Sequence, residues 1–158
     1  MKFTIATANS RRDKIWKNKE VTWAEFLGRA NTTILTSESM EEYKKLPKAK
    51  QDEVKDVGGF LAGKLREGKR KTGYVEHRSM LTLDMDYAAS DIWEQITLFY
   101  DFTCCIYSTH KYTEEKPRLR LIIPLARIVT ADEYTAIGRK VAESIGIEQF
   151  DDTTYEPS

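Results

Sequence analysis

The sequence predicts a single α+β domain. Its 158 residues, 41% of them apolar, suffice for one domain with its own hydrophobic core. Capping-box patterns mark the starts of three helices, and short apolar segments bounded by turn residues predict strands. We expect an N-terminal extension of helices and strands over residues 1–75 and a more regular core over residues 76–158.

The first expected elements are a strand and a helix. An apolar segment at residues 3–7 predicts a short strand, and a basic loop at residues 10–14 follows it. Thr22 and Glu25 match a capping box, in which the hydroxyl and the carboxylate bind the first free amides of a helix. This helix is expected to run through about Ala30.

Two short, charged helices are expected next. Ser39 opens the first with another capping box, and Pro47 separates it from a second near residues 48–56, which two glycines end. A strand is then predicted at residues 60–65. The basic segment at residues 66–73 predicts a flexible turn.

The second half of the chain has a more regular order. The expected elements are a strand from residue 79 through an acidic pair, a helix at about 90–101, strands at about 103–109 and 118–124, and a helix at about 131–146. The order strand, helix, strand, strand, helix is that of a ferredoxin-like βαββαβ fold without its last strand. We therefore expect a core that is incomplete at its C-terminal end.

Positive and negative charges balance in this chain. Lys and Arg together number 25, as do Asp and Glu, so the formal net charge is zero. A globally basic nucleic-acid-binding surface is therefore excluded, and contacts with nucleic acid must come from local patches. The candidates are Arg11 and Arg12 in one loop, and Lys69, Arg70 and Lys71 in another, for which a purely solvated loop is the alternative.

The cysteines and the hydropathy pattern indicate a cytoplasmic location. Cys104 and Cys105 are adjacent, which fits neither the usual disulfide geometry nor a zinc-binding pattern. They are interpreted as buried thiols in a reducing compartment. The sequence contains neither a signal-peptide core nor the roughly 20 apolar residues of a membrane span, so no membrane partner is expected.

Asp84 and Asp86 lie one residue apart in an apolar segment. On a strand both carboxylates point to one side, while Leu83 and Met85 point into the core. Two neighbouring anions need a cation or basic groups to compensate them, and Mg²⁺ prefers oxygen ligands of this kind. The pair predicts a metal site. The alternative is a strand end whose two acids face water.

Polar residues on the two following strands predict a phosphate-binding face. If their turn is symmetric about Glu114, His110 lies opposite Arg118. Ser108 then lies opposite Arg120, and all four side chains share one face. Their donors suit phosphate oxygens. The alternate residues are then expected in the core: Leu119, Leu121 and Ile123.

A third carboxylate follows the last helix, at Asp151 or its neighbour Asp152. Three carboxylates could hold two metal ions that activate a 3′-hydroxyl and stabilise the leaving pyrophosphate. His110 and the two arginines would hold the triphosphate. This arrangement predicts nucleotidyl transfer.

The joint pattern resembles the archaeo-eukaryotic primase superfamily. Its motifs are Asp-x-Asp on a strand, Ser-x-His, and an Asp after a hydrophobic residue, and they stand here at Asp84 and Asp86, at Ser108 and His110, and at Asp151. Further segments are similar to the N-terminal primase-polymerase domain of phage and integrated-element replication proteins, often described as virulence-associated protein E-like. These segments are residues 55–60, 108–111, 116–121 and 150–158.

The resemblance implies an RRM-like catalytic fold with Mg²⁺ or Mn²⁺ as cofactor. It also implies synthesis from nucleoside triphosphates, either NTP or dNTP, on a single-stranded DNA template in the cytoplasm of a bacterial host cell. It implies Asp84, Asp86 and Asp151 as metal ligands and His110 as a catalytic phosphate contact. The nucleotide contacts expected from the motifs and the strand geometry are Ser108, His110, Lys111, Arg118 and Arg120. Relatives continue past the Pro-Ser at residues 157–158, often into a helicase domain, so a helicase domain or protein is an expected partner.

Two other functions compete with a primase or primase-polymerase. One is a non-catalytic module that keeps the fold and binds nucleic acid or nucleotide through its basic residues. The other is a metal nuclease or rolling-circle initiator, which needs a His-hydrophobic-His metal pair. The two histidines here, His77 and His110, are far apart in the sequence, so this function ranks last.

Overall fold

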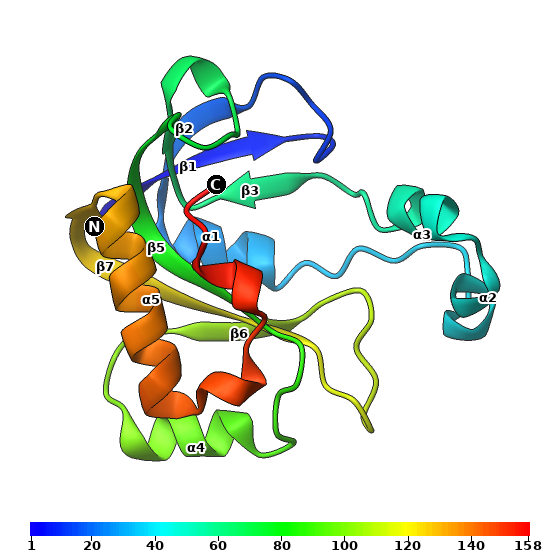
Figure 1. The fold of residues 1–158 in the computed structure, drawn as a ribbon. Helices are drawn as coiled ribbons and strands as arrows, with labels where there is room; N and C mark the ends of the chain where they lie inside the picture. Colours follow the sequence, from blue (N-terminus) through cyan, green and yellow to red (C-terminus); the bar gives the residue numbers. More distant parts are fainter.

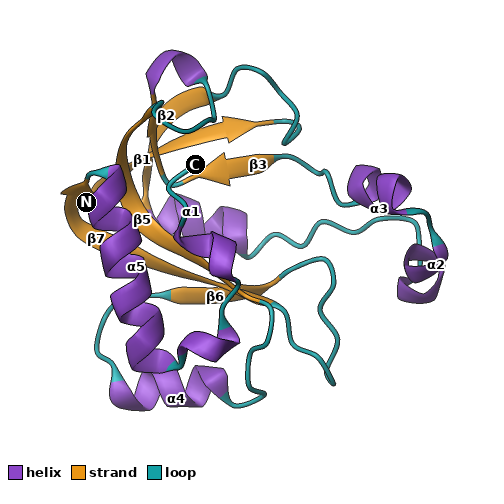
Figure 2. Ribbon diagram, viewed as in Figure 1, coloured by secondary structure: helices purple, strands orange, loops and turns teal.

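Two antiparallel sheets organise the computed structural model, which describes all of residues 1–158 (Figures 1 and 2). The strands are β1 (Lys2–Ala8), β2 (Lys17–Thr22), β3 (Gly59–Leu61), β4 (Gly63–Leu65), β5 (Val75–Met85), β6 (Cys105–Ser108) and β7 (Leu119–Val129). The helices are α1 (Trp23–Ala30), α2 (Met40–Lys45), α3 (Lys48–Val54), α4 (Ile92–Phe99) and α5 (Ala131–Ile145). The predicted α+β class is confirmed.

The three capping boxes are all formed. The hydroxyls of Thr22, Ser39 and Thr130 each accept the backbone N–H of the Glu three residues on, and each Glu carboxylate accepts the backbone N–H of its cap residue. These contacts satisfy amides that have no partner within the helix. The starts of α1, α2 and α5 are therefore the ones that the sequence predicts.

Strand β2 is an element that the sequence analysis missed. It pairs antiparallel with β1 at the edge of the first sheet, whose strand order is β2-β1-β3. Half of the residues in Lys17–Thr22 are charged, and the first four are exposed. Lysines are typical of exposed edge strands, so no apolar alternation marks this strand.

The single strand predicted at residues 60–65 is two strands in different sheets. β3 pairs with β1, whereas β4 pairs with β5 in the second sheet. Between them Ala62 is fully buried. A Cβ atom on Gly63 would lie 2.1 Å from the carbonyl oxygen of His77, so only glycine allows this close approach of β4 to β5.

The second sheet has the strand order β4-β5-β7-β6. Its elements follow in the predicted order, β5, α4, β6, β7 and α5. No closing strand follows α5 in residues 76–158. The chain continues instead into two 3₁₀ turns, Ile147–Gln149 and Asp152–Tyr155, and β4 from the N-terminal half occupies the edge beside β5.

Hydrophobic clusters lie on both faces of the second sheet. On one face α4 and α5 cover a core that contains Leu83, Met85, Leu121 and Ile123 (Figure 1), and Leu119 packs against it, as expected. On the other face, Met80 and Ile122 pack against side chains of β1 and α1. Because residues alternate between the faces, Asp84 lies on the face that β1 and α1 partly cover.

None of the five helices combines the length and the apolar character that crossing a bilayer requires. The longest, α5, has 15 residues and turns polar side chains to solvent along its outer face.

Candidate functional site: an acidic pair and its arginines

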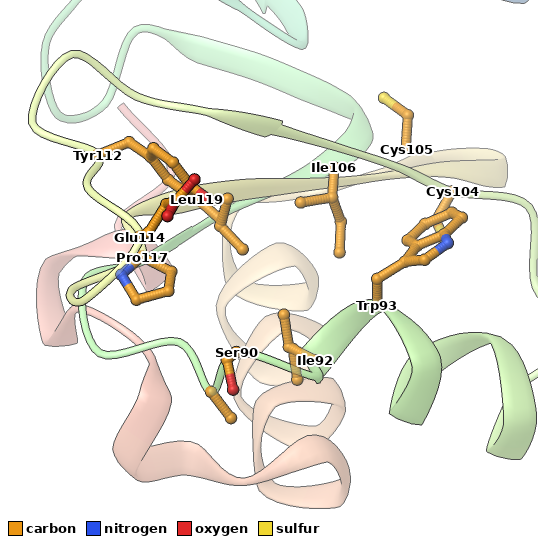
Figure 3. A pocket seen from close by; sticks show the side chains of 11 residues that line it. Ser90, Ile92, Trp93, Cys104, Cys105, Ile106, Tyr112, Glu114, Pro117 and Leu119 are labelled. Carbon is orange, nitrogen blue, oxygen red and sulfur yellow. The ribbon is translucent and has the colours of Figure 1, made fainter.

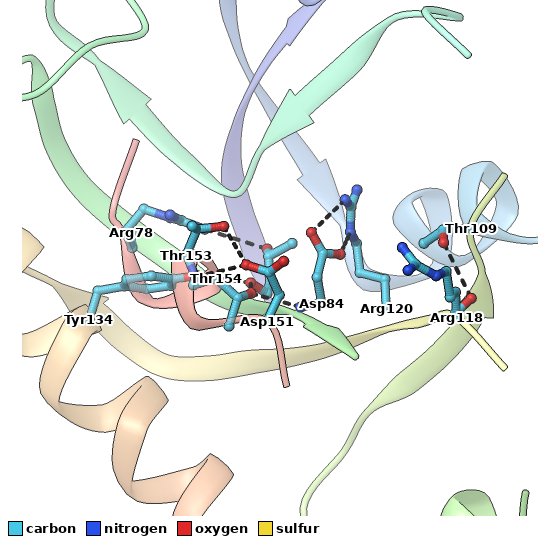
Figure 4. A network of polar contacts seen from close by, with 10 residues as sticks. Arg78, Asp84, Thr109, Arg118, Arg120, Tyr134, Asp151, Thr153 and Thr154 are labelled. Atoms are coloured by element: carbon cyan, nitrogen blue, oxygen red, sulfur yellow. Dashed lines mark hydrogen bonds and ion pairs between the residues drawn. The ribbon is translucent and has the colours of Figure 1, made fainter. Parts of the chain in front are cut away.

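Each carboxylate of the acidic pair binds an arginine of the neighbouring strand β7. Asp84 lies opposite Arg120 in the β5–β7 register. The Arg120 guanidinium donates to both of its carboxylate oxygens, from Nε at 2.5 Å and from Nη2 at 3.0 Å (Figure 4). Arg118 donates from Nη1 to Oδ2 of Asp86 at 2.7 Å. Of the predicted face, Arg118 and Arg120 thus lie together and point to the acidic pair.

Arg120 lies between the acid and an aromatic ring. Tyr107 of β6 is its cross-strand neighbour on the side away from Asp84. Burial opposes the charge of the guanidinium, but its hydrogen bonds with Asp84 and its attraction to Tyr107 and Asp84 outweigh this, and the pKa of Arg120 lies above its ordinary value. Arg120 therefore remains a cation at any pH at which the protein folds.

The turn after α5 brings Asp151 to the strand that carries Asp84. The backbone N–H of Asp151 donates to the carbonyl of Asp84 at 2.9 Å, and the hydroxyl of Thr154 accepts the backbone N–H of Asp84 at 2.7 Å (Figure 4). The Asp151 carboxylate itself accepts the backbone N–H and the hydroxyl of Thr153. Asp152 is exposed. Of the two candidates for a third acid, Asp151 is thus the one anchored to Asp84.

The carboxylates do not form a ready-made metal centre. No group of three or more His, Cys, Asp or Glu side chains is close enough together to hold a metal ion. Carboxylate oxygens are the donors that Mg²⁺ and Mn²⁺ prefer, so the donor type fits. The carboxylates of Asp84 and Asp86 would have to leave their arginines to bind metal. The ligand roles of Asp84, Asp86 and Asp151 remain predictions.

The expected register of the β6–β7 hairpin is wrong by one residue. Ser108 lies opposite Leu119 rather than Arg120, and the backbone N–H of Thr109 donates to the carbonyl of Arg118. The turn closes between Thr113 and Lys116 instead of being symmetric about Glu114. Since a shift of one residue exchanges the two faces of a strand, Ser108 lies on the face opposite to Arg120 and does not join the acidic pair.

The family model described as the VapE N-terminal domain matches residues 1–158. The chain belongs to the VapE N-terminal domain family. This membership agrees with the resemblance to replication proteins of phages and integrated elements. No curated protein matches the chain, and no solved structure does.

His110 of this VapE N-terminal domain lies beyond the end of β6 and contacts α2. Its ring meets Tyr43 edge to face, with 4.5 Å between the ring centroids. Burial lowers the pKa of His110; Glu38 opposes this effect, whereas Lys55 and Lys111 add to it. Lys111 lies in the same positive region, near Arg118, and burial followed by repulsion from Lys48, Lys55 and Arg118 lowers its pKa. His110 and Lys111 thus form a basic region beside Arg118.

Both histidines should make the fold less stable in mild acid. Burial also lowers the pKa of His77, with Glu76 opposing it. The pKa of histidine in the unfolded chain is about 6.5. A histidine whose folded-state pKa is lower than this contributes to the stability of the fold above pH 6.5. The contribution is lost as the pH falls from 6.5 through the folded-state pKa. We expect both histidines to titrate below 6.5 in an NMR titration of their ring resonances and the free energy of unfolding to fall over that interval. The His77→Asn, His110→Asn variant should lose this pH dependence, and a folded-state pKa above 6.5 for either ring would contradict the prediction.

The basic loop at residues 66–73 is held by defined hydrogen bonds rather than being a free turn. Trp16 donates its backbone N–H to the carbonyl of Gly68 at 2.8 Å, and Arg66 donates to the carbonyl of Tyr74 at 2.7 Å. Gly68 has a φ of +66°, and a Cβ atom on it would lie 2.4 Å from the Trp16 carbonyl. The loop conformation therefore requires glycine at this position.

The three consecutive cations of this loop each lie over an aromatic ring. Arg70 lies over the ring of Trp16 at 5.0 Å, and Lys69 and Lys71 lie over the ring of Tyr74 at 5.3 and 4.6 Å. Burial, followed by repulsion from Arg120 and Arg11, lowers the pKa of Arg70. Arg70 is therefore near enough to Arg120 for the two charges to interact. In the other predicted segment, Arg11 pairs with Asp52 at 3.3 Å and Arg12 is exposed.

An apolar pocket of about 400 Å³ lies between α4 and the β6–β7 hairpin (Figure 3). Trp93, Ile106 and Tyr112 are among its lining residues, and none of the acidic pair or its arginines lines it. Sequence analysis missed this pocket. Cys104 and Cys105 also line it and are half-buried rather than fully buried. Burial raises the pKa of Cys105 to about 11, so its thiol is unreactive at neutral pH.

Proposed function

We propose that this domain carries out nucleotidyl transfer in replication, as a primase or primase-polymerase that acts on single-stranded DNA. The observation that carries the proposal is the acidic pair at the end of β5, with a forked arginine facing each carboxylate at 2.5 to 3.0 Å. Carboxylates that bind metal and arginines that bind phosphate are the groups that phosphoryl transfer needs side by side. The family match over residues 1–158 supports a role in replication.

Each group has a role in this proposal. Asp84 and Asp86, with Asp151 anchored beside them, would hold Mg²⁺ or Mn²⁺, which supplies activation of the primer 3′-hydroxyl and stabilisation of the leaving pyrophosphate. Arg118 and Arg120 would bind the triphosphate oxygens with their planar donor forks. His110 would donate a ring N–H to a phosphate oxygen. Lys111 would add positive charge beside Arg118.

A primer-synthesis assay tests the proposal directly. The chain is incubated with single-stranded DNA, with either ribonucleotides or deoxynucleotides, and with Mg²⁺, Mn²⁺ or EDTA. We expect labelled products with at least one nucleotide set and none in EDTA. Absence of products in every combination, from a chain that is folded by circular dichroism, would contradict the proposal.

A non-catalytic binding module is the second candidate function. It is favoured by one observation: both carboxylates are already compensated by arginines, and no cluster of three metal-binding side chains is formed. Such a module would bind single-stranded DNA equally well with and without EDTA and would synthesise nothing. The primer-synthesis assay and a DNA-binding titration in EDTA therefore distinguish the two candidates.

The loop that carries Lys69, Arg70 and Lys71 is expected to contact the DNA backbone. Replacing all three with Gln should weaken binding to single-stranded DNA and lower the slope of log affinity against log salt by about 2, since each lost phosphate contact removes about 0.7. A fluorescence-anisotropy titration at several salt concentrations measures both. The matched control replaces three lysines that lie elsewhere, Lys2, Lys19 and Lys140. Equal slopes for the two triple variants would argue against a specific contact of the loop.

A further inference from the structure

Both carboxylates of the acidic pair are bound by arginines of the chain itself. Both carboxylates are partly open to solvent, with 38% of the Asp84 side chain and 28% of the Asp86 side chain exposed. A divalent cation can therefore reach them. Arg120 nevertheless takes both oxygens of Asp84, and Arg118 takes Oδ2 of Asp86. A cation that arrives alone and binds both carboxylates through these oxygens must break the hydrogen bonds and leave two arginines without their carboxylate partners.

The surroundings make unpaired arginines unfavourable. Arg70 forms no ion pair or hydrogen bond with an acid and lies within electrostatic reach of Arg120. Lys111 lies close enough to Arg118 for the two to repel each other. Moving Asp84 and Asp86 onto a metal ion would thus take their carboxylate partners from Arg118 and Arg120 in a region that already holds Arg70 and Lys111. A phosphate-bearing ligand removes this obstacle, because guanidinium forks bind phosphate oxygens as well as carboxylate oxygens.

We propose that Arg118 and Arg120 form an internal switch that makes metal binding depend on a polyphosphate ligand. Without the ligand, the two guanidinium groups occupy the carboxylates and keep the affinity for a divalent cation low. When a polyphosphate takes the arginines, the carboxylates become free and bind the cation. The switch rests on the proposed function, since it assigns Asp84 and Asp86 to metal and the two arginines to phosphate.

Linkage gives the switch two measurable consequences. If the arginines oppose metal binding, removing one of them must raise the affinity for metal alone. If the carboxylates oppose phosphate binding, removing one of them must raise the affinity for polyphosphate in the absence of metal, because a coupling between two sites acts equally in both directions. These effects are opposite to those expected if all four residues simply build one binding site.

The first test measures Mn²⁺ binding to the full chain without nucleotide, from the electron paramagnetic resonance signal of free Mn²⁺. We expect Arg120→Gln to bind Mn²⁺ about tenfold more tightly than wild type, which corresponds to about 1.4 kcal/mol. Arg70→Gln is the matched control, because it removes a nearby positive charge that binds no carboxylate. It should change the affinity by less than about threefold, as expected for a screened charge. If Arg120→Gln binds Mn²⁺ no more tightly than Arg70→Gln, the switch is overturned.

The second test measures binding of inorganic tripolyphosphate in EDTA by calorimetry. Asp84→Asn should bind it more tightly than wild type by about the same factor, tenfold. Asp101→Asn, which removes an exposed acid that binds no arginine, is the control and should match wild type. Equal affinities for Asp84→Asn and Asp101→Asn would also overturn the switch.

Further measurements distinguish a failure of the switch from a failure of the proposed function. Thermal melting shows whether each variant is folded. If Arg120→Gln is not folded, Arg118→Gln, which loses a single hydrogen bond, is used in its place. If Asp84→Asn abolishes Mn²⁺ binding while the arginine variants leave it unchanged, the metal site of the proposed function stands and only the switch is wrong. If neither wild type nor Arg120→Gln binds Mn²⁺, the metal site and the switch are both wrong.

Discussion

Under the proposed function, the Asp84→Ala, Asp86→Ala double variant is expected to lose nucleotide incorporation by at least about a thousandfold, since about 4 kcal/mol of transition-state stabilisation would disappear with the proposed metal ligands. The two carboxylates are the only acids at the end of β5 that face the arginines of β7. Extension of a labelled primer on single-stranded DNA in Mn²⁺ measures the loss. Wild-type product from the double variant would refute the metal-site assignment.

Two controls accompany this variant. Asp101→Ala removes an exposed acid that forms no ion pair or hydrogen bond with a basic side chain and should retain full activity. The double variant itself should stay folded, because the Arg118 and Arg120 side chains are 24% and 31% exposed, so water replaces part of what each guanidinium loses with its carboxylate. A melting temperature close to that of wild type would show that the loss of activity is chemical rather than structural.

Asp151 and Asp152 can be separated in the same assay. The backbone of Asp151 is bound to Asp84, whereas Asp152 is exposed. Asp151→Asn should therefore reduce incorporation strongly, and Asp152→Asn should have little effect.

Arg78→Ala is expected to have the largest effect on stability, lowering the free energy of unfolding by about 3 kcal/mol. Arg78 is only 3% exposed. Its guanidinium donates to the carbonyl of Ala62 at 2.9 Å and to that of Pro157 at 2.8 Å, and it lies 3.9 Å from the centre of the Tyr134 ring (Figure 4). Removing it leaves two carbonyls without their charged donor and opens a cavity beside Tyr134. Urea denaturation measures the change.

A second arginine provides the matched control. Arg139 also lies over a tyrosine ring, that of Tyr155 at 5.0 Å, but it is exposed. An exposed cation–π contact contributes about 0.5 to 1 kcal/mol, so Arg139→Ala should destabilise the fold by no more than that. Equal losses in the two variants would show that the burial and the hydrogen bonds of Arg78 add little to the free energy of unfolding.

The helices could be predicted from the sequence because their signals are local. A capping box places both of its partners within three residues of each other, as in Thr22 with Glu25, so no tertiary information is needed. Strand β2 and the division of residues 60–65 between two sheets could not be predicted. The charged residues of the edge strand β2 carry no apolar alternation. The division of residues 60–65 depends on the pairing of β3 with β1, which lies far away in the sequence, while β4 pairs with β5.

The site was predictable only in part, for the same reason. Alternation along a strand correctly placed Asp84 with Asp86 on one face and Arg118 with Arg120 on one face. The position of Ser108 was wrong, because the register of a hairpin depends on the geometry of its turn. The contact of His110 with Tyr43 and the apolar pocket beside α4 join segments that no local pattern connects.

The sequence by itself thus determined the helix starts, the alternation of each strand and the identity of the acidic pair, since these depend on neighbouring residues. Tertiary structure alone decided which residue faces which. It paired each carboxylate with an arginine, turned Ser108 to the other face, and anchored Asp151 to Asp84. Strand register and chain packing arise from burial summed over the whole domain, and short motifs do not encode them.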